Sequence, residues 1–154
     1  MRRVLPLILC LSACAGSDVV STALPPNYLK DAPEIVAAAD WSAPETVTVT
    51  MADFAFRPLE LNLHRDRPTR LVLANPTTRD HAIVAEQFFR EVAVRQLVGP
   101  DGTTPAPWIG KVVVPAGQTR EIWLVPARYG AYRFECDVTG HSALGENGLI
   151  NVIP

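Results

Sequence analysis

Short stretches in which apolar and polar residues alternate dominate the chain from residue 45 onward. Residues 46–50 read Thr-Val-Thr-Val-Thr, the period-two pattern of a half-buried β-strand. Proline, glycine, asparagine and aspartate separate these stretches and favour turns. Strands of this length, without regular intervening helices, indicate an all-β antiparallel sandwich or barrel. The predicted strands are 46–51, 59–63, 69–74, 81–84, 111–114, 119–124, 130–136 and 148–153.

Two segments have a different pattern. Phe88, Phe89, Val92 and Leu97 give a partly helical spacing, and Gly-Pro-Asp-Gly at 99–102 then predicts a turn. We therefore expect a short helical insertion around 86–97, packed on the sandwich. Residues 15–44 are rich in Ala, Pro, Ser and Asp and contain few large apolar side chains. This composition predicts a linker, with a short helix at 31–39.

The N-terminus has the features of an export signal. Arg2 and Arg3 precede an apolar stretch at 4–11, which is shorter than the roughly 20 residues of a membrane-spanning helix. Leu-Ser-Ala-Cys at 11–14 is similar to a bacterial lipobox, in which a diacylglycerol is attached to the cysteine, here Cys14. The alternative is an ordinary secretory signal cleaved nearby. Both place the mature protein outside the cytoplasm, on the periplasmic side, and Ala15 after the cysteine favours the outer membrane.

These segments divide the chain of 154 residues, a length suited to one domain plus an additional segment. We predict a lipoprotein signal peptide at 1–13, a lipid-anchored linker at 14–44 and one domain at 45–154. Contact with the membrane is expected through the N-terminal lipid only.

Composition excludes several classes of function. The chain has 14 Lys and Arg residues against 16 Asp and Glu, and a net charge of −2. No run of basic residues is present, which argues against nucleic-acid binding. The sequence also contains no phosphate-binding glycine loop and no Ser/His/Asp order. We therefore predict that the protein is not an enzyme.

Cysteine usage draws attention to one thiol. Cys10 leaves with the signal peptide and Cys14 is lipidated, so Cys136 remains alone. A single thiol in an oxidising compartment has no intramolecular disulfide partner. It is therefore a buried inert residue, a reactive nucleophile or a metal ligand.

Two histidines favour the metal ligand. His141 follows Cys136 after four intervening residues, across a turn that contains glycine, and His81 opens a predicted strand. One thiolate and two imidazoles form the set that copper favours in electron-transfer sites. A Cys/His nucleophilic dyad is the alternative, but the second histidine makes metal binding the better interpretation. His64, beside two charged residues in a turn, is expected to be exposed.

Several motifs follow one another along residues 45–154. They are Asp-Phe-Ala-Phe-Arg-Pro-Leu-Glu-Leu at 53–61, Leu-Val-Leu-Ala-Asn at 71–75, Val-Pro-Ala-Gly-Gln-Thr at 114–119, Gly-Ala-Tyr-Arg-Phe-Glu-Cys at 130–136, Gly-His at 140–141 and Gly-Glu-Asn-Gly-Leu-Ile-Asn-Val at 145–152. In these motifs the chain resembles the cupredoxins, the blue-copper family. The resemblance implies a Greek-key β-sandwich and one copper ion bound by His81, Cys136 and His141.

One position departs from the family's pattern. The family usually places a methionine, as a long axial ligand, five positions after the second histidine, where this chain has Glu146. A carboxylate is a harder donor that favours Cu(II). If Glu146 is the axial ligand, we predict a lower reduction potential and a more tetragonal site. If it points to solvent, the site is three-coordinate or takes a water. A third alternative is a site without a redox role, or one that accepts another metal.

The combined features predict an extracytoplasmic mononuclear copper protein that acts in one-electron transfer. By analogy with the family, His141 would be the exit point for the electron, framed by Ala143, Leu144 and the Trp108 loop. A cytochrome or terminal oxidase is the expected partner. The alternatives are a periplasmic copper carrier or scavenger and a metal-free interaction module.

Overall fold

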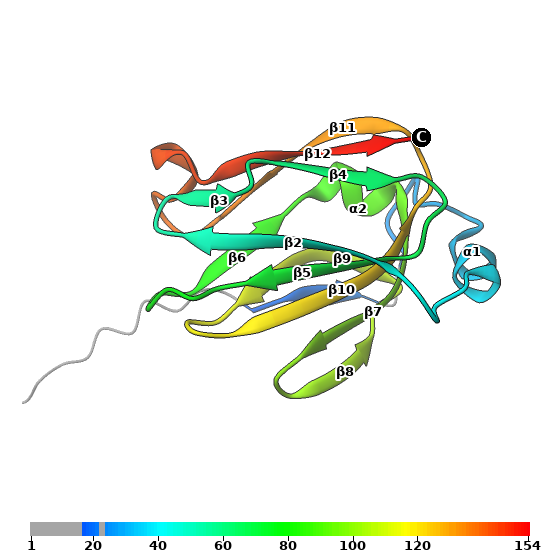
Figure 1. Ribbon diagram of the computed structural model, residues 1–154, viewed down its shortest axis with the longest axis horizontal. Helices are drawn as coiled ribbons and strands as arrows, with labels where there is room; N and C mark the ends of the chain where they lie inside the picture. Colours follow the sequence, from blue (N-terminus) through cyan, green and yellow to red (C-terminus); the bar gives the residue numbers. More distant parts are fainter. Residues whose placement is uncertain (1–16, 22–23) are drawn as a thin grey trace, which may run out of the picture.

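The structure, a computed structural model, describes residues 17–21 and 24–154 and consists of two six-stranded β-sheets packed face to face (Figure 1). The first sheet has the order β1-β9-β6-β11-β12-β4 and the second the order β3-β2-β5-β10-β7-β8. The strands are β1 (Val19–Ser21), β2 (Glu45–Ala52), β3 (Ala55–Arg57), β4 (Glu60–His64), β5 (Thr69–Ala74), β6 (His81–Val84), β7 (Val92–Gly99), β8 (Gly102–Pro105), β9 (Trp108–Val114), β10 (Thr119–Pro126), β11 (Gly130–Glu135) and β12 (Asn147–Ile153). The predicted all-β sandwich is confirmed.

The pairing differs from a purely antiparallel sandwich in two places. Strand β4 runs parallel to β12, and β2 runs parallel to β5. The other paired neighbours are antiparallel. Both parallel pairs join strands that are distant in sequence or separated by other strands, so the local pattern could not indicate their direction.

Alternation places the apolar side of each strand between the sheets. In β2, Val49 and Met51 are fully buried, whereas Thr46 and Thr48 are exposed. The largest buried side chains include four phenylalanines, and full burial of such a side chain contributes about 1.5–3 kcal/mol. These four residues are Phe56, Phe88, Phe89 and Phe134.

All eight predicted strands are present as β2, β4, β5, β6, β9, β10, β11 and β12. The predicted helical insertion at 86–97 is only partly correct, because α2 (Glu86–Arg90) ends after five residues and strand β7 follows it. Val92, Ala93 and Val94 are all buried, since Ala93 packs against the N-terminal segment on the outer face of the sheet. Burial on both faces therefore hides the period-two pattern of this strand.

Much of the predicted linker packs on the sandwich. The helix expected at 31–39 is α1 (Ala32–Ala38), and Tyr28, Leu29 and Ala32 form a second apolar cluster with residues of β7 and β10. The Tyr28 hydroxyl also donates a hydrogen bond of 2.5 Å to the Pro107 carbonyl. The segment thus lies against the domain instead of separating it from a membrane, because its few apolar side chains converge on one patch.

Strand β1 extends this packing along the edge of the first sheet, where it pairs antiparallel with β9. Edge strands with free N–H and C=O groups invite unwanted pairing, and β1 covers part of one such edge. The predicted signal peptide and Cys14 lie outside the described residues. Within the described part of the chain, no helix is long and apolar enough to cross a membrane.

Candidate metal centre

Four side chains from separate parts of the chain meet at one end of the sandwich. His81 begins β6, Cys136 directly follows β11, and His141 and Glu146 flank the short helix η1 (Ser142–Leu144). One ligand atom of each residue lies within 4.8 Å of the others. Cys136, His81 and Glu146 are fully buried and His141 is 5% exposed. The structure therefore brings together all four residues that the sequence predicted as ligands.

Backbone hydrogen bonds close the loop that carries three of these residues. The Cys136 N–H donates to the Glu146 carbonyl at 3.1 Å, and the Glu146 N–H donates to the His141 carbonyl at 3.0 Å. Gly145 has φ +110°, a conformation that strains residues with a Cβ atom. This turn brings the carboxylate of Glu146 back beside the thiol at which the loop began.

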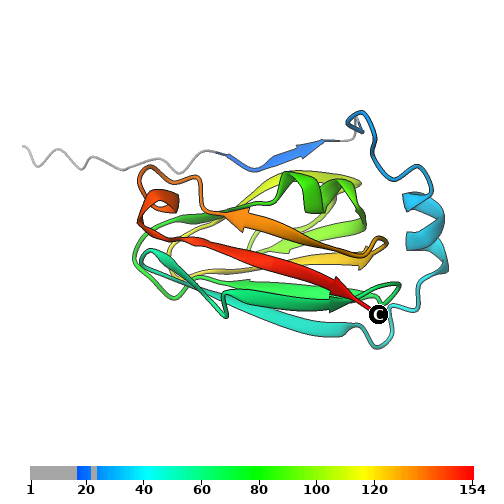
Figure 2. The ribbon, with the colours of Figure 1, turned by 90° about the horizontal axis from the view of Figure 1, so that it is seen from above.

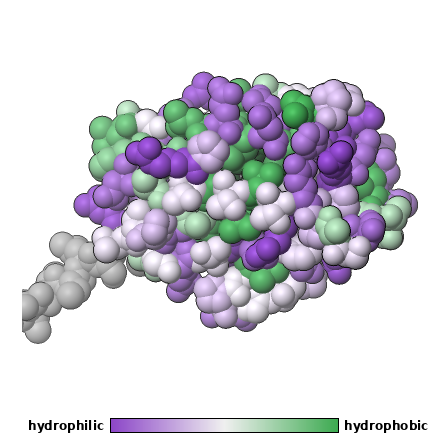
Figure 3. All heavy atoms as spheres, in the orientation of Figure 1, coloured by the Kyte–Doolittle hydropathy of each residue, from purple (hydrophilic) through white to green (hydrophobic). Residues whose placement is uncertain are grey.

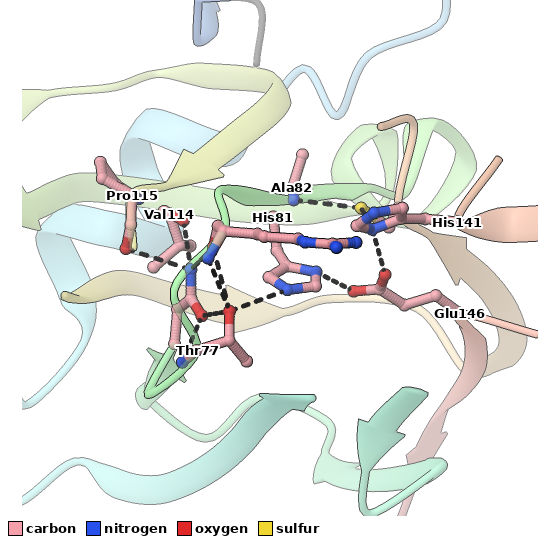
Figure 4. A network of polar contacts seen from close by, with 10 residues as sticks. Thr77, His81, Ala82, Val114, Pro115, His141 and Glu146 are labelled. Atoms are coloured by element: carbon pink, nitrogen blue, oxygen red, sulfur yellow. Dashed lines mark hydrogen bonds and ion pairs between the residues drawn. The ribbon is translucent and has the colours of Figure 1, made fainter. Parts of the chain in front are cut away.

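Glu146 lies between the two imidazoles. Its Oε1 is 2.6 Å from His81 Nδ1 and its Oε2 is 2.7 Å from His141 Nδ1 (Figure 4). The alternative that this glutamate points to solvent is therefore wrong, because its side chain is fully buried. Burial raises the pKa of Glu146 to about 7. A cation at this position would restore the charged carboxylate.

The thiol is buried beside the same groups. Cys136 Sγ is 3.7 Å from His141 Nδ1 and accepts a hydrogen bond of 3.4 Å from the Ala82 N–H. Burial raises the pKa of Cys136 to about 11, although the Ala82 and Val138 N–H groups oppose this effect. A nucleophilic cysteine needs a lowered pKa and access to its substrate. This environment argues against the Cys/His dyad and suits a thiol that releases its proton when it binds a metal.

A threonine holds the outer nitrogen of His81. His81 Nε2 lies 3.1 Å from Thr77 Oγ1, on the side of the ring that faces away from Glu146 (Figure 4). With Nε2 protonated and donating to this hydroxyl, Nδ1 keeps its lone pair for a metal. Such outer partners fix the tautomer and orientation of ligand histidines. Burial, together with the nearby His141, lowers the pKa of His81, which also favours the neutral imidazole.

Asn75 connects this threonine to the sheet. Its side-chain amide donates to the carbonyls of Arg79, Val114 and Pro115 at 2.8, 2.8 and 3.1 Å. Its Oδ1 accepts hydrogen bonds from the N–H and the hydroxyl of Thr77 at 3.0 and 2.8 Å. This one side chain thereby ties the loop before His81 to the end of β9. The sequence prediction did not assign a role to Asn75 or Thr77, although Asn-Pro-Thr-Thr at 75–78 is a recognisable turn signal.

Phe54 packs against the site, whereas His64 lies apart from it. The ring of Phe54 meets the His141 ring edge-on, with 5.2 Å between centroids. His64 lies outside the cluster, as expected, but the prediction that it is exposed is only partly correct. Its side chain is 32% exposed, because its Nδ1 lies 3.0 Å from the Glu45 carboxylate.

The cluster fits one metal ion. Bonds of about 2.0–2.3 Å to nitrogen, oxygen and sulfur donors would keep the donor atoms within about 4–4.6 Å of one another. The four donor atoms of the cluster lie within 4.8 Å of one another, which is close to this range. One thiolate, two imidazoles and a further weak position match the donor set of mononuclear copper sites.

The comparisons with known proteins identify the family of this chain and agree with its fold. A sequence model of the cupredoxin-like domain matches residues 34–146. This match covers more than half of the chain, and the protein belongs to the cupredoxin family. The expected copper cofactor is consistent with both the family and the four-residue cluster. At the sequence level, no curated protein matches the chain.

Solved structures share the fold. An auracyanin B structure has a TM-score of 0.51 and 21% identity, covering 75% of this chain and 94% of the other. A dithionite-reduced auracyanin from the photosynthetic bacterium Roseiflexus castenholzii has a TM-score of 0.53 and 20% identity, covering 73% and 100%. A multi-copper oxidase from Pseudomonas thermotolerans has a TM-score of 0.59 and 17% identity, covering 75% of this chain but 31% of the oxidase.

Proposed function

We propose that the protein transfers single electrons through one copper ion bound by His81, Cys136 and His141, with Glu146 as the axial ligand. The observation that carries this proposal is the buried cluster of one thiol, two imidazoles and one carboxylate. The donor atoms of these groups all lie within 4.8 Å of one another, which suits one shared cation. An interaction module without a metal needs no such convergence of donor atoms, which makes it the weaker alternative.

The chain's own residues would supply rigidity and electronic tuning. Copper, when bound, supplies the exchange of one electron between Cu(I) and Cu(II). Thr77 holds His81 in the metal-binding tautomer, and the Ala82 N–H donates to Cys136 Sγ. The backbone of Glu146 is fixed by two hydrogen bonds, one to Cys136 and one to His141. Side chains fixed in this way would move little between the two charge states.

His141 is the best candidate for the electron's exit. It is the only one of the four ligand candidates with measurable exposure, and Leu144, three residues later, is 64% exposed. Hydrophobic side chains gather over this end of the molecule in Figure 3, where Figure 1 shows η1. The predicted participation of the Trp108 loop is wrong. Trp108 packs against the second apolar cluster, which includes Tyr28, and Val114, at the other end of β9, pairs with His81.

A carrier is favoured over an enzyme. The similarity to the auracyanins covers 94% and 100% of those chains, whereas the oxidase is matched over only 31% of its length. A cytochrome or terminal oxidase would be a suitable partner. The N-terminal motif supports attachment through lipid at Cys14, on the periplasmic side of the inner or outer membrane.

The first test adds stoichiometric Cu(II) to the purified chain in detergent and records visible and EPR spectra. We expect an intense thiolate-to-copper charge-transfer band at one ion per chain. Cys136→Ser should abolish the band, and Glu146→Met should shift it toward the usual blue type if the carboxylate is axial. Absence of the band, with Cys136 still titrating as a free thiol, would refute the proposal.

The carboxylate also favours a second candidate, a copper carrier that does not cycle its ion. A hard oxygen donor stabilises Cu(II) relative to Cu(I). Cyclic voltammetry of the loaded protein separates the two candidates. A reversible couple with fast electron transfer supports the electron carrier, whereas tight Cu(II) binding without a reversible couple supports copper carriage.

A further inference from the structure

We propose that residues 18–21 form an N-terminal clamp that turns the metal-centre end of the sandwich toward the membrane. The electron partner is then a redox protein embedded in that same membrane. This inference rests on the proposed lipid attachment at Cys14 and on electron transfer at the metal centre. It adds the orientation of the domain and the kind of partner that can reach it.

Asp18 is the strongest contact of the clamp. Its carboxylate accepts two hydrogen bonds from Arg120 Nη1, at 2.7 and 2.6 Å, and one from the Val113 N–H at 2.8 Å. The same guanidinium nitrogen also donates to the Val113 carbonyl at 2.9 Å. Both side chains are partly buried, and charge-assisted hydrogen bonds of this kind are stronger than neutral ones. The clamp therefore ties the start of the described chain to both sheets.

The strand direction places the beginning of the clamp at the metal-centre end. In the antiparallel pairing of β1 with β9, Val19 is opposite Lys111 and Ser21 is opposite Trp108. Strand β9 then continues to Val114, which pairs with His81. Figure 2 shows the same arrangement, with the start of β1 at the end that carries η1 and α1 at the opposite end.

The chain between the anchor and the clamp is short. Four residue steps separate Cys14 from Asp18, and a fully extended chain spans at most about 14 Å over that length. The seven residues of β9 alone span about 20 Å toward the α1 end. The lipid therefore holds the metal-centre end closer to the membrane than the α1 end.

Without the clamp the geometry would be different. Among the described residues that follow the clamp, the first buried one is Tyr28, which packs at the α1 end. Fourteen residue steps from Cys14 would allow about 50 Å of reach. The domain could then turn its metal centre away from the membrane. The clamp thus determines which end of the domain faces the lipid surface.

This orientation selects the partner. Leu144, which is 64% exposed, lies two residues before Glu146, and Leu59, which is 57% exposed, lines a surface hollow together with Gly145. A large soluble protein would have to enter a gap of about 14 Å or less. A membrane-embedded redox protein, whose own surface is at lipid level, meets this end directly.

The test measures orientation without copper. A fluorescent amino acid replaces either Ala143, beside the metal centre, or Ala38, exposed in α1, in the full lipidated chain on vesicles that contain acceptor lipids. We expect energy transfer to be several-fold higher from position 143 than from position 38. Asp18→Ala should remove this difference, whereas the control Glu86→Ala, which breaks an exposed ion pair with Arg90, should leave it unchanged.

A second variant guards against misfolding of Asp18→Ala. Twelve Gly and Ser residues inserted after residue 16 leave the clamp intact but lengthen the attachment, and should reduce the difference between the two positions. Equal transfer from both positions in the native chain, or a difference that persists in Asp18→Ala, would overturn the orientation. Failure of the native chain to float with vesicles would overturn the lipid attachment as well. A copper spectrum of the same sample reports separately on the metal centre.

The partner is tested by electron transfer from a soluble reduced cytochrome. We expect the copper of the vesicle-bound native chain to be reduced several-fold more slowly than that of the detergent-solubilised chain. The long-insertion variant should recover the faster rate on vesicles. Equal rates for the native chain in both states would mean that a soluble partner reaches the site, and would overturn the choice of a membrane-embedded one.

Discussion

Replacing Asn75 with alanine should weaken both the fold and the metal centre. The side chain is 1% exposed and takes part in five hydrogen bonds with the loop before His81 and the end of β9. The bond to the Val114 carbonyl is fully buried, whereas water can replace the partly buried ones. An unsatisfied buried polar group costs about 1–3 kcal/mol. We therefore expect Asn75→Ala to lower the free energy of unfolding by about 2–3 kcal/mol.

The same substitution should also lower the affinity for copper, through its effect on Thr77. Without Asn75, the hydroxyl that holds His81 Nε2 loses one of its two hydrogen-bond acceptors and keeps the Arg79 carbonyl at 3.0 Å. Mutation of such outer partners typically lowers metal affinity by about 10–100-fold. We expect a loss at the lower end of this range, because both the imidazole and the threonine remain.

Urea denaturation of the metal-free protein and competitive copper titration measure the two effects. Asn151→Ala is a matched control, since this exposed amide makes one hydrogen bond of 3.2 Å to Asn62. The control should change the free energy of unfolding by less than about 0.5 kcal/mol. A loss below about 1 kcal/mol in Asn75→Ala, with unchanged copper affinity, would show that this network does not support the site.

Three further predictions concern single positions. Thr77→Val should lower copper affinity while changing the free energy of unfolding by less than Asn75→Ala does, and equal copper affinity in titration would contradict the role of its hydroxyl. Gly148→Ala should destabilise the fold by about 1–3 kcal/mol or more, because the new Cβ would lie 2.6 Å from the Leu59 carbonyl oxygen and 2.5 Å from Phe134 Cζ. An unchanged denaturation midpoint would be inconsistent with this crowding. In the metal-free protein, Glu146 has a folded pKa raised to about 7 from 4.5, so the stability linked to its protonation is fully present below pH 4.5 and is lost as the pH rises toward 7. Relative to Glu146→Gln, the native chain should thus lose on the order of 3 kcal/mol across this interval, and parallel pH profiles of unfolding would refute the raised pKa.

The sequence alone determined most of the strands and the main ligand set. A strand with one buried face has a local period of two, so eight strands could be predicted from short windows. Cys136, the one cysteine outside the predicted signal peptide and lipobox, and its two histidines were equally visible, because few chemistries use an unpaired cysteine in a protein that is predicted to be exported. The family pattern also identified Glu146 as the residue in the axial position.

Other features depended on contacts between distant segments, which local periodicity does not contain. Strand β7 was hidden because Ala93, on its outer face, is covered by the N-terminal segment. Only the folded chain showed that Glu146 lies buried between two imidazoles, and that Asn75 holds the loop of His81 against β9. The N-terminal clamp is of the same kind, since Asp18 and Arg120 are 102 residues apart. The N-terminal segment, whose composition is typical of a linker, therefore packs against the sandwich. Its partners come within reach only in the tertiary structure.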